Sequence, residues 1–222
     1  RSLIGEVTPC SPPEAISKYQ EILRSPFRPH NRLGTVDEET PGTPYAPAPA
    51  RTPGPASSGN LIVACMKDEA PYILEWIAYH RAIGFDTFLI YTNDCSDATD
   101  AILARLDEMG VVHHRDNTGW TGNSPQQCAL DAAMAEPVFR NAAWIAHIDV
   151  DEFVNIRCGN GTLADLFART GEATNIAMTW RLFGHDGVTR IKDRPVIAQF
   201  TSCAPKFAPK PHTAWGFKTL FR

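Results

Sequence analysis

Short apolar runs alternate with helix-like spacing through residues 60–222. Runs of about four to seven apolar residues are typical of buried strands, and apolar residues three or four positions apart are typical of helices packed on them. We predict strands at 61–66, 87–91, 111–114, 142–148 and 175–182, helices at 70–83, 98–109, 125–136 and 162–169, and a strand-like end at 215–221. This β-α-β-α-β order predicts an α/β domain with a mostly parallel sheet and right-handed crossovers.

The first 58 residues follow a different pattern. They hold more than half of the chain's 18 prolines, and residues 40–59 contain almost no large apolar side chain. Such a segment cannot offset its own ordering entropy, so we expect a polyproline-like linker there. Residues 13–24 have the spacing of one helix. The predicted organisation is an N-terminal segment at 1–39, a linker at 40–59, and one domain at 60–222.

Composition narrows the classes of protein. The chain has 222 residues and a formal net charge of −4, which argues against a nucleic-acid binder. The sequence has no run of 18 apolar residues, so we predict no membrane span, and it has no basic amphipathic helix that would predict a membrane anchor. The six cysteines form no C-x-x-C pair, which removes the usual zinc spacing and fits a reducing cytoplasm. The chain begins without Met and stops after a strand-like run, so we expect a piece of a longer polypeptide, truncated at its C-terminus.

Acidic and amide side chains collect where the predicted strands end. Asp149 and Asp151 follow the apolar run 142–148, and strand alternation would point both carboxylates to one side. The ends of the two earlier strands supply 66–69 and 92–97, and the carboxyl ends of parallel strands share one edge. Two hard oxygen ligands suit Mn²⁺ or Mg²⁺, which completes its shell with phosphate oxygens. The pattern predicts a metal-bound diphosphate, whereas its structural alternative is a pair of surface acids in a turn.

Five segments, in order, resemble one group of enzymes. Residues 65–84 resemble the pattern K-N-E-x-x-Y-L-x-E-W-I-x-Y-H-x-x-x-G, and residues 90–99 resemble Y-D-N-x-S-x-D-x-T. A Q-Q helix start, D-x-D-E-F and W-x-x-F-G follow at 126–127, 149–153 and 180–184. Together they resemble bacterial family-2-like glycosyltransferases and the related family 92, once catalogued as unknown-function domain 23. The resemblance covers roughly residues 61–220.

The resemblance implies a GT-A fold, a Rossmann-like sheet flanked by helices, and transfer of a sugar from a nucleotide donor. It places Asp149 and Asp151 on the pair of acids that holds the metal and the diphosphate. The family pattern has Asn where this chain has Asp68 and often Asp where it has Thr92, and its further His ligand would come from a region beyond residue 222. The residues that fall in the donor-binding loops are Lys67, Glu69, Asn93, Asp94 and Asp97.

The catalytic base is open at this stage. Inversion of the anomeric centre would need a carboxylate or His near the acceptor hydroxyl, and Glu152, His185 and Asp186 are the candidates. Their alternatives are support for the metal site for Glu152 and a polar turn for the other two. Arg181 is assigned to the diphosphate, with a plain salt bridge as its alternative. His80 is interpreted as a core histidine rather than a ligand.

The preferred function is that of a metal-dependent glycosyltransferase that uses a UDP- or GDP-sugar and Mn²⁺ or Mg²⁺. The acceptor would be a growing surface polysaccharide or another glycan, reached in the cytoplasm or peripherally at the inner face of the membrane. One alternative is a phosphatase of the haloacid-dehalogenase type with Asp149 as nucleophile and Asp151 as acid/base. A second is a non-catalytic module that binds a glycan or a partner through the same fold.

Overall fold

The computed structural model describes residues 13–25, 48, 51–185, 187–204 and 216–222. The chain divides into two compact units. One comprises Arg1–Gly42 and Met178–Phe217, and the other comprises Thr43–Ala177 and Lys218–Arg222. The second unit carries almost all of the predicted α/β pattern.

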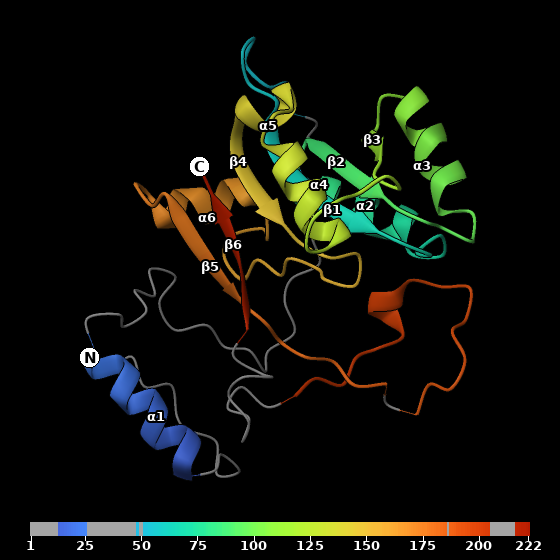
Figure 1. Ribbon diagram of the computed structural model, residues 1–222. Coiled ribbons are helices and arrows are strands. Elements are labelled where there is room, and N and C mark those ends of the chain that lie inside the picture. Colours follow the sequence, from blue (N-terminus) through green and yellow to red (C-terminus); the bar gives the residue numbers. More distant parts are fainter. Residues whose placement is uncertain (1–12, 26–47, 49–50, 186, 205–215) are drawn as a thin grey trace. The chain divides into compact units, whose positions relative to one another are not determined.

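Within the described residues, the strands form one six-stranded sheet in the order β3-β2-β1-β4-β6-β5. The strands β3, β2, β1 and β4 run parallel to one another, and β6 runs antiparallel to β4 (Figure 1). The strand bounds are β1 Gly59–Met66, β2 Thr87–Thr92, β3 His113–Asp116, β4 Ala142–His147, β5 Asn175–Thr179 and β6 Phe217–Phe221. The predicted class, a mostly parallel α/β sheet flanked by helices, is confirmed.

The helices lie close to where the apolar spacing predicts them. Their bounds are α1 Pro13–Arg24, α2 Ile73–Ile83, α3 Thr99–Glu108, α4 Pro125–Ala133, α5 Pro137–Arg140 and α6 Leu163–Thr170, with a 3₁₀ turn η1 at Val196–Ala198. Helix α2 begins three residues later than predicted, because Ala70, Pro71 and Tyr72 form a turn before it. The short helix α5 was not predicted. Across the described residues, each helix is too short or too polar to cross a membrane.

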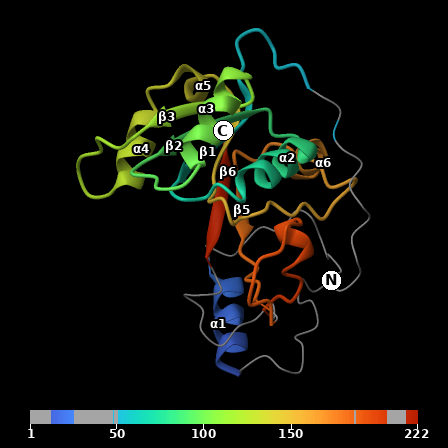
Figure 2. The same cartoon turned by 90° about the vertical axis from the view of Figure 1, so that its right-hand side faces the viewer.

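Both faces of the sheet are covered. Figure 2 shows α4 and α5 on one side of the strands and α2 and α6 on the other. On the α4 side, Leu61, Val63 and Leu89 pack with Ala129 and Ala133 of the helix. Alternation along the strands turns the intervening residues to the opposite face, where α2 lies. Strands buried on both faces therefore read as the continuous apolar runs seen in the sequence.

Two helix ends show why the local sequence folds as it does. Gly84 ends α2 in a left-handed conformation at φ 111°, which glycine adopts without a steric cost. Thr162 accepts a hydrogen bond from the backbone N–H of Asp165, and the Asp165 carboxylate accepts one from the backbone of Thr162, which makes a capping box at α6. The proposed linker at 40–59 lies largely outside the described residues, and the three-part domain division stays a prediction.

Candidate functional site

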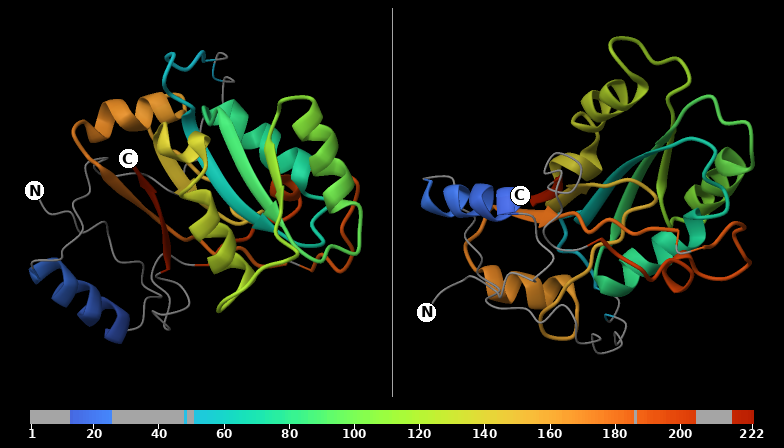
Figure 3. Two further views of the ribbon diagram at one scale, coloured as in Figure 1. Left: turned by 45° about the horizontal axis from the view of Figure 1, so that its top comes forward. Right: turned by 90° about the horizontal axis from the view of Figure 1, so that it is seen from below.

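A cleft of about 410 Å³ opens at the end of the sheet where β1 and β2 finish. Met66 pairs with Thr92 at the last position of the parallel register, so the chain leaves both strands at one edge (Figure 3). The lining residues are Cys65, Met66, Lys67, Asn93, Asp94, Trp120, Pro125, Gln126 and Asp149. Four residues assigned to the site from the sequence therefore share one cleft: Lys67, Asn93, Asp94 and Asp149.

The turn after β4 presents the acidic pair. Strand β4 ends at His147, and the backbone N–H of Glu152 donates to the carbonyl of Asp149 at 3.1 Å, so both aspartates lie in a turn. The argument from strand alternation was therefore wrong, because alternation stops where the strand stops. The Asp149 side chain is 42% exposed and Asp151 is exposed. The turn, rather than the strand, decides where the two carboxylates lie.

Lys218 on β6 binds this turn. Its Nζ lies 2.9 Å from Oδ2 of Asp149 and 3.2 Å from Oε2 of Glu152. The same Glu152 oxygen accepts a hydrogen bond from the backbone N–H of Asp149 at 2.9 Å. Burial lowers the pKa of Lys218, but the hydrogen bond and the negative charges of Asp149 and Glu152 outweigh burial and raise it. The site thus contains a fixed ammonium group that the sequence analysis did not identify.

Helix α2 holds the segment that follows Asp151. Trp76 donates its indole N–H to the carbonyl of Glu152 at 2.9 Å, and the Tyr79 hydroxyl donates to the carbonyl of Val154 at 3.0 Å. The Val154 N–H donates to Nε2 of His80 at 3.3 Å, while Nδ1 of His80 lies 2.8 Å from the carbonyl of Trp76. Burial lowers the pKa of His80 to about 4, so the ring is neutral and Nδ1 carries the hydrogen. The interpretation of His80 as a core histidine is confirmed.

These contacts join two of the motifs that define the resemblance. Trp76, Tyr79 and His80 belong to the E-W-I-x-Y-H part of the first motif. Their partners are the carbonyl of Glu152, in the D-x-D-E-F segment, and the backbone of Val154, directly after that segment. A backbone group buried without a partner costs free energy, so the polar tips of these three side chains satisfy that segment while their rings fill the core. The first motif therefore positions the second.

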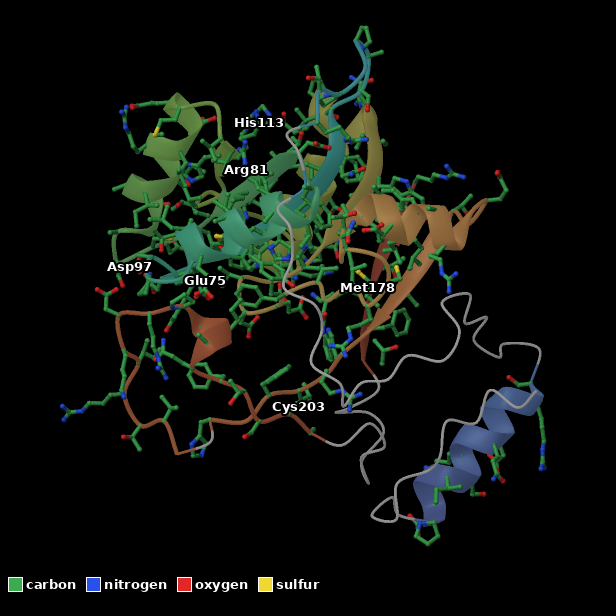
Figure 4. The ribbon with its side chains drawn as sticks, turned by 180° about the vertical axis from the view of Figure 1, so that it is seen from behind. Glu75, Arg81, Asp97, His113, Met178 and Cys203 are labelled. Carbon is green, nitrogen blue, oxygen red and sulfur yellow. The ribbon has the colours of Figure 1, made fainter. Side chains whose placement is uncertain are left out.

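The loops after β1 and β2 are tied together by their own acids. Asp68 has φ 59°, and its Oδ1 accepts from the backbone N–H of Ser96 at 2.6 Å. Asp97 accepts from the backbone N–H groups of Thr99 at 2.8 Å and Ala70 at 3.1 Å. These hydrogen bonds lower the pKa of Asp68 and, chiefly through Thr99, that of Asp97. Figure 4 shows Asp97 near Glu75 at this end of the sheet, whereas Arg81 and His113 lie toward the other end.

The pKa of Glu69 is raised by burial and by negative charges that include Asp151 in the turn after β4. Burial raises its pKa first, and the charges of Asp151 and Asp97 raise it further. A cation would relieve that repulsion. Within the described part of the chain, no three His, Cys, Asp or Glu side chains converge on one point. Metal binding by Asp149 and Asp151 stays a prediction, in which the ion would take one or two carboxylates from the protein and its remaining oxygens from a ligand or water.

Gln126 is a further cleft residue, and the Q-Q motif was its signal. Its amide nitrogen lies 2.8 Å from Nε2 of His147, whose Nδ1 lies 3.0 Å from the carbonyl of Val63. Because a carbonyl only accepts, Nδ1 must carry the hydrogen in this arrangement, which leaves Nε2 to accept from the Gln126 amide. The hydrogen-bonded chain fixes Gln126 at the cleft wall. Trp120, also at the wall, carried no signal in the sequence.

Three other assigned residues fall in the segment Met178–Phe217 of the first unit. Arg181 donates from Nη1 to the carbonyl of Ala204 at 3.1 Å, and Nδ1 of His185 accepts from the N–H of Gly187 at 3.1 Å. Asp186 lies outside the described residues. The diphosphate role of Arg181 and the catalytic roles of His185, Asp186 and Glu152 stay predictions. Glu152 contacts the backbone N–H of Asp149 and the Lys218 ammonium, and its alternative role as support for the metal site also stays a prediction.

Solved structures offer a weak likeness. A crystal structure of 4-diphosphocytidyl-2C-methyl-D-erythritol synthase aligns with 74% of this chain and 75% of its own at a TM-score of 0.38 and 13% identity.

Curated relatives from plants are more informative. A rice family 92 glycosyltransferase protein is 28% identical over 149 residues, and one from Ricinus communis is 23% identical over 215 residues. An Arabidopsis thaliana family 92 protein is 28% identical over 159 residues. These matches span 63%, 90% and 67% of this chain but 24%, 37% and 26% of the relatives. This chain therefore corresponds to part of the length of each relative.

The family model for glycosyltransferase family 92 matches residues 62–206, which contain every cleft residue. That range begins in β1 and includes both motifs joined by α2. The chain belongs to glycosyltransferase family 92.

Proposed function

We propose that this chain carries the donor-binding part of a glycosyltransferase, which moves a sugar from a nucleotide-sugar to a glycan hydroxyl. The observation that supports the proposal most is the cleft at the carboxyl ends of β1 and β2, with Asp149 at its wall. Parallel α/β sheets bind ligands at that edge, and about 410 Å³ falls within the range of small-ligand sites. Family membership favours this activity over the haloacid-dehalogenase-type phosphatase.

Under this proposal, the site residues have two roles. Asp149 and Asp151 would hold Mn²⁺ or Mg²⁺, and Lys67, Asn93 and Asp94 would contact the nucleotide. A bound divalent ion would supply positive charge that stabilises the departing nucleoside diphosphate. The chain's own contribution is orientation, because the α2 contacts and the Lys218 bridge hold the Asp149 turn in place. Location in the cytoplasm, or peripherally at a membrane, stays a prediction.

Thermal unfolding in the presence of nucleotides tests the proposal. UDP, GDP and CMP are each added with and without Mn²⁺. A nucleotide at about 100 times its dissociation constant should add roughly 2.7 kcal/mol of stability. We expect one nucleotide to give a metal-dependent shift that Asp149→Asn abolishes.

The control is Glu108→Gln, which removes a carboxylate that pairs with Arg105 on the exposed surface of α3 and should keep the shift. If no nucleotide raises the unfolding temperature, the proposal is wrong for this chain. If glycans instead bind equally well to the wild type and to Asp149→Asn, the non-catalytic module is the better description.

A further inference from the structure

The Lys218 ammonium lies beside the carboxylates of the turn after β4. Its Nζ contacts Asp149 Oδ2 at 2.9 Å and Glu152 Oε2 at 3.2 Å. The Lys218 side chain is 17% exposed, against 42% for Asp149 and 21% for Glu152. The group is therefore anchored in the protein, while the Asp149 carboxylate is open to the cleft.

Strand pairing rather than flexible reach brings Lys218 there. Strand β6 pairs antiparallel with β4, with Ile145 opposite Phe221 and Ala146 opposite Leu220. Lys218 lies further back along β6, beside the turn that continues from β4. An ammonium delivered by a strand is present whether or not a ligand is bound. It balances charge in a turn that also contains Asp151.

We propose that Lys218 is a built-in counter-ion that competes with the divalent metal for Asp149, so that the metal binds tightly only together with the diphosphate. This inference rests on the proposed function, because it assigns the order in which that site takes its metal and its donor. A free metal ion would have to approach Asp149 against the ammonium charge. A diphosphate brings enough negative charge and oxygen ligands to satisfy both cations.

The size of the effect follows from the charges. A divalent ion about 5 Å from an ammonium is repelled, even at the dielectric constant of water, by an amount that corresponds to roughly tenfold in affinity. Removal of the ammonium should therefore strengthen binding of Mn²⁺ alone by about tenfold. The same change should strengthen binding of Mn²⁺ with the diphosphate far less, because the diphosphate screens the ammonium.

Electron paramagnetic resonance of free Mn²⁺ measures this directly without any turnover. The wild type is compared with Lys218→Gln and Lys218→Met, which remove the charge, and with Lys218→Arg, which keeps it. We expect both uncharged variants to bind Mn²⁺ about tenfold more tightly than the wild type, and Lys218→Arg to match the wild type. Arg105→Met removes a cation that is 70% exposed on α3 and should change the affinity by less than about twofold.

Unchanged Mn²⁺ affinity in Lys218→Gln, with circular dichroism showing a folded protein, would overturn the proposal. Weaker binding in both uncharged variants would overturn it as well, because it would mean that Lys218 helps the metal to bind. If Lys218→Met does not fold, Lys218→Gln and Lys218→Arg still decide the question, since they differ from each other mainly in charge. Failure of the proposed function has another sign: the wild type then shows no nucleotide-dependent shift, whatever the variants do with Mn²⁺.

Discussion

Acidification should destabilise this protein through His80. The ring belongs to α2 and is fully buried, and burial lowers its pKa from an ordinary 6.5 to about 4. The unfolded chain therefore takes up a proton at His80 between pH 6.5 and pH 4 while the folded chain does not. Stability from this group is fully present above pH 6.5 and is lost as the pH falls toward 4. One pKa unit corresponds to 1.36 kcal/mol, so the loss from His80 amounts to about 3 kcal/mol.

Urea unfolding at a series of pH values from 7.5 to 4 measures this loss. Carboxylates with lowered pKa values also contribute to acid unfolding. The wild type is therefore compared with His80→Gln, whose side chain does not titrate. The variant should start less stable at pH 7.5, because the contacts with Trp76 and Val154 are perturbed, and then lose about 3 kcal/mol less on acidification. The exposed His185→Gln is the matched control and should keep the wild-type profile. Parallel pH profiles for wild type and His80→Gln would refute the reasoning.

Three further predictions concern stability and positioning. Gly59→Ala should lower the free energy of unfolding in urea by about 2–3 kcal/mol, because Gly59 has φ 79° and an added Cβ would collide with the Asp86 carboxylate. A variant as stable as the wild type would contradict this. Trp76→Phe removes the hydrogen bond to the Glu152 carbonyl. It should reduce the free energy of Mn²⁺-dependent nucleotide binding, measured by calorimetry, more than it reduces the free energy of unfolding. Thr162→Ala should cost about 1 kcal/mol through the lost cap of α6, whereas Thr162→Ser should cost little.

The apolar pattern by itself determined the class of fold. Continuous apolar runs at β1, β2 and β4 can only be satisfied when both faces of each strand are covered, and the intervening helical spacing supplies the cover. The caps at Thr162 and Gly84 are local as well, because each depends on residues within one turn of its own helix. The ends of the helices were predicted less accurately, because the start of α2 depends on a turn rather than on apolar spacing.

The candidate site divides in the same way. The acids and amides that follow the strands were identified from order alone, since parallel strands must end at a common edge. Their geometry was not, because the alternation argument for Asp149 and Asp151 fails once the chain leaves the strand. Lys218 was missed because it comes 69 residues after Asp149 and reaches it only through the pairing of β6 with β4.

The tertiary structure also decided what the motifs are for. Sequence shows that the E-W-I-x-Y-H and D-x-D-E-F segments occur in one chain. Hydrogen bonds from Trp76 and Tyr79, and to His80, show that the first segment holds the backbone at Glu152, in the second segment, and at Val154, directly after it. Local sequence determines which residues form strands, helices and caps, because those choices depend on near neighbours. Contacts between residues about 70 positions apart depend on how the elements pack, and only the folded chain determines that.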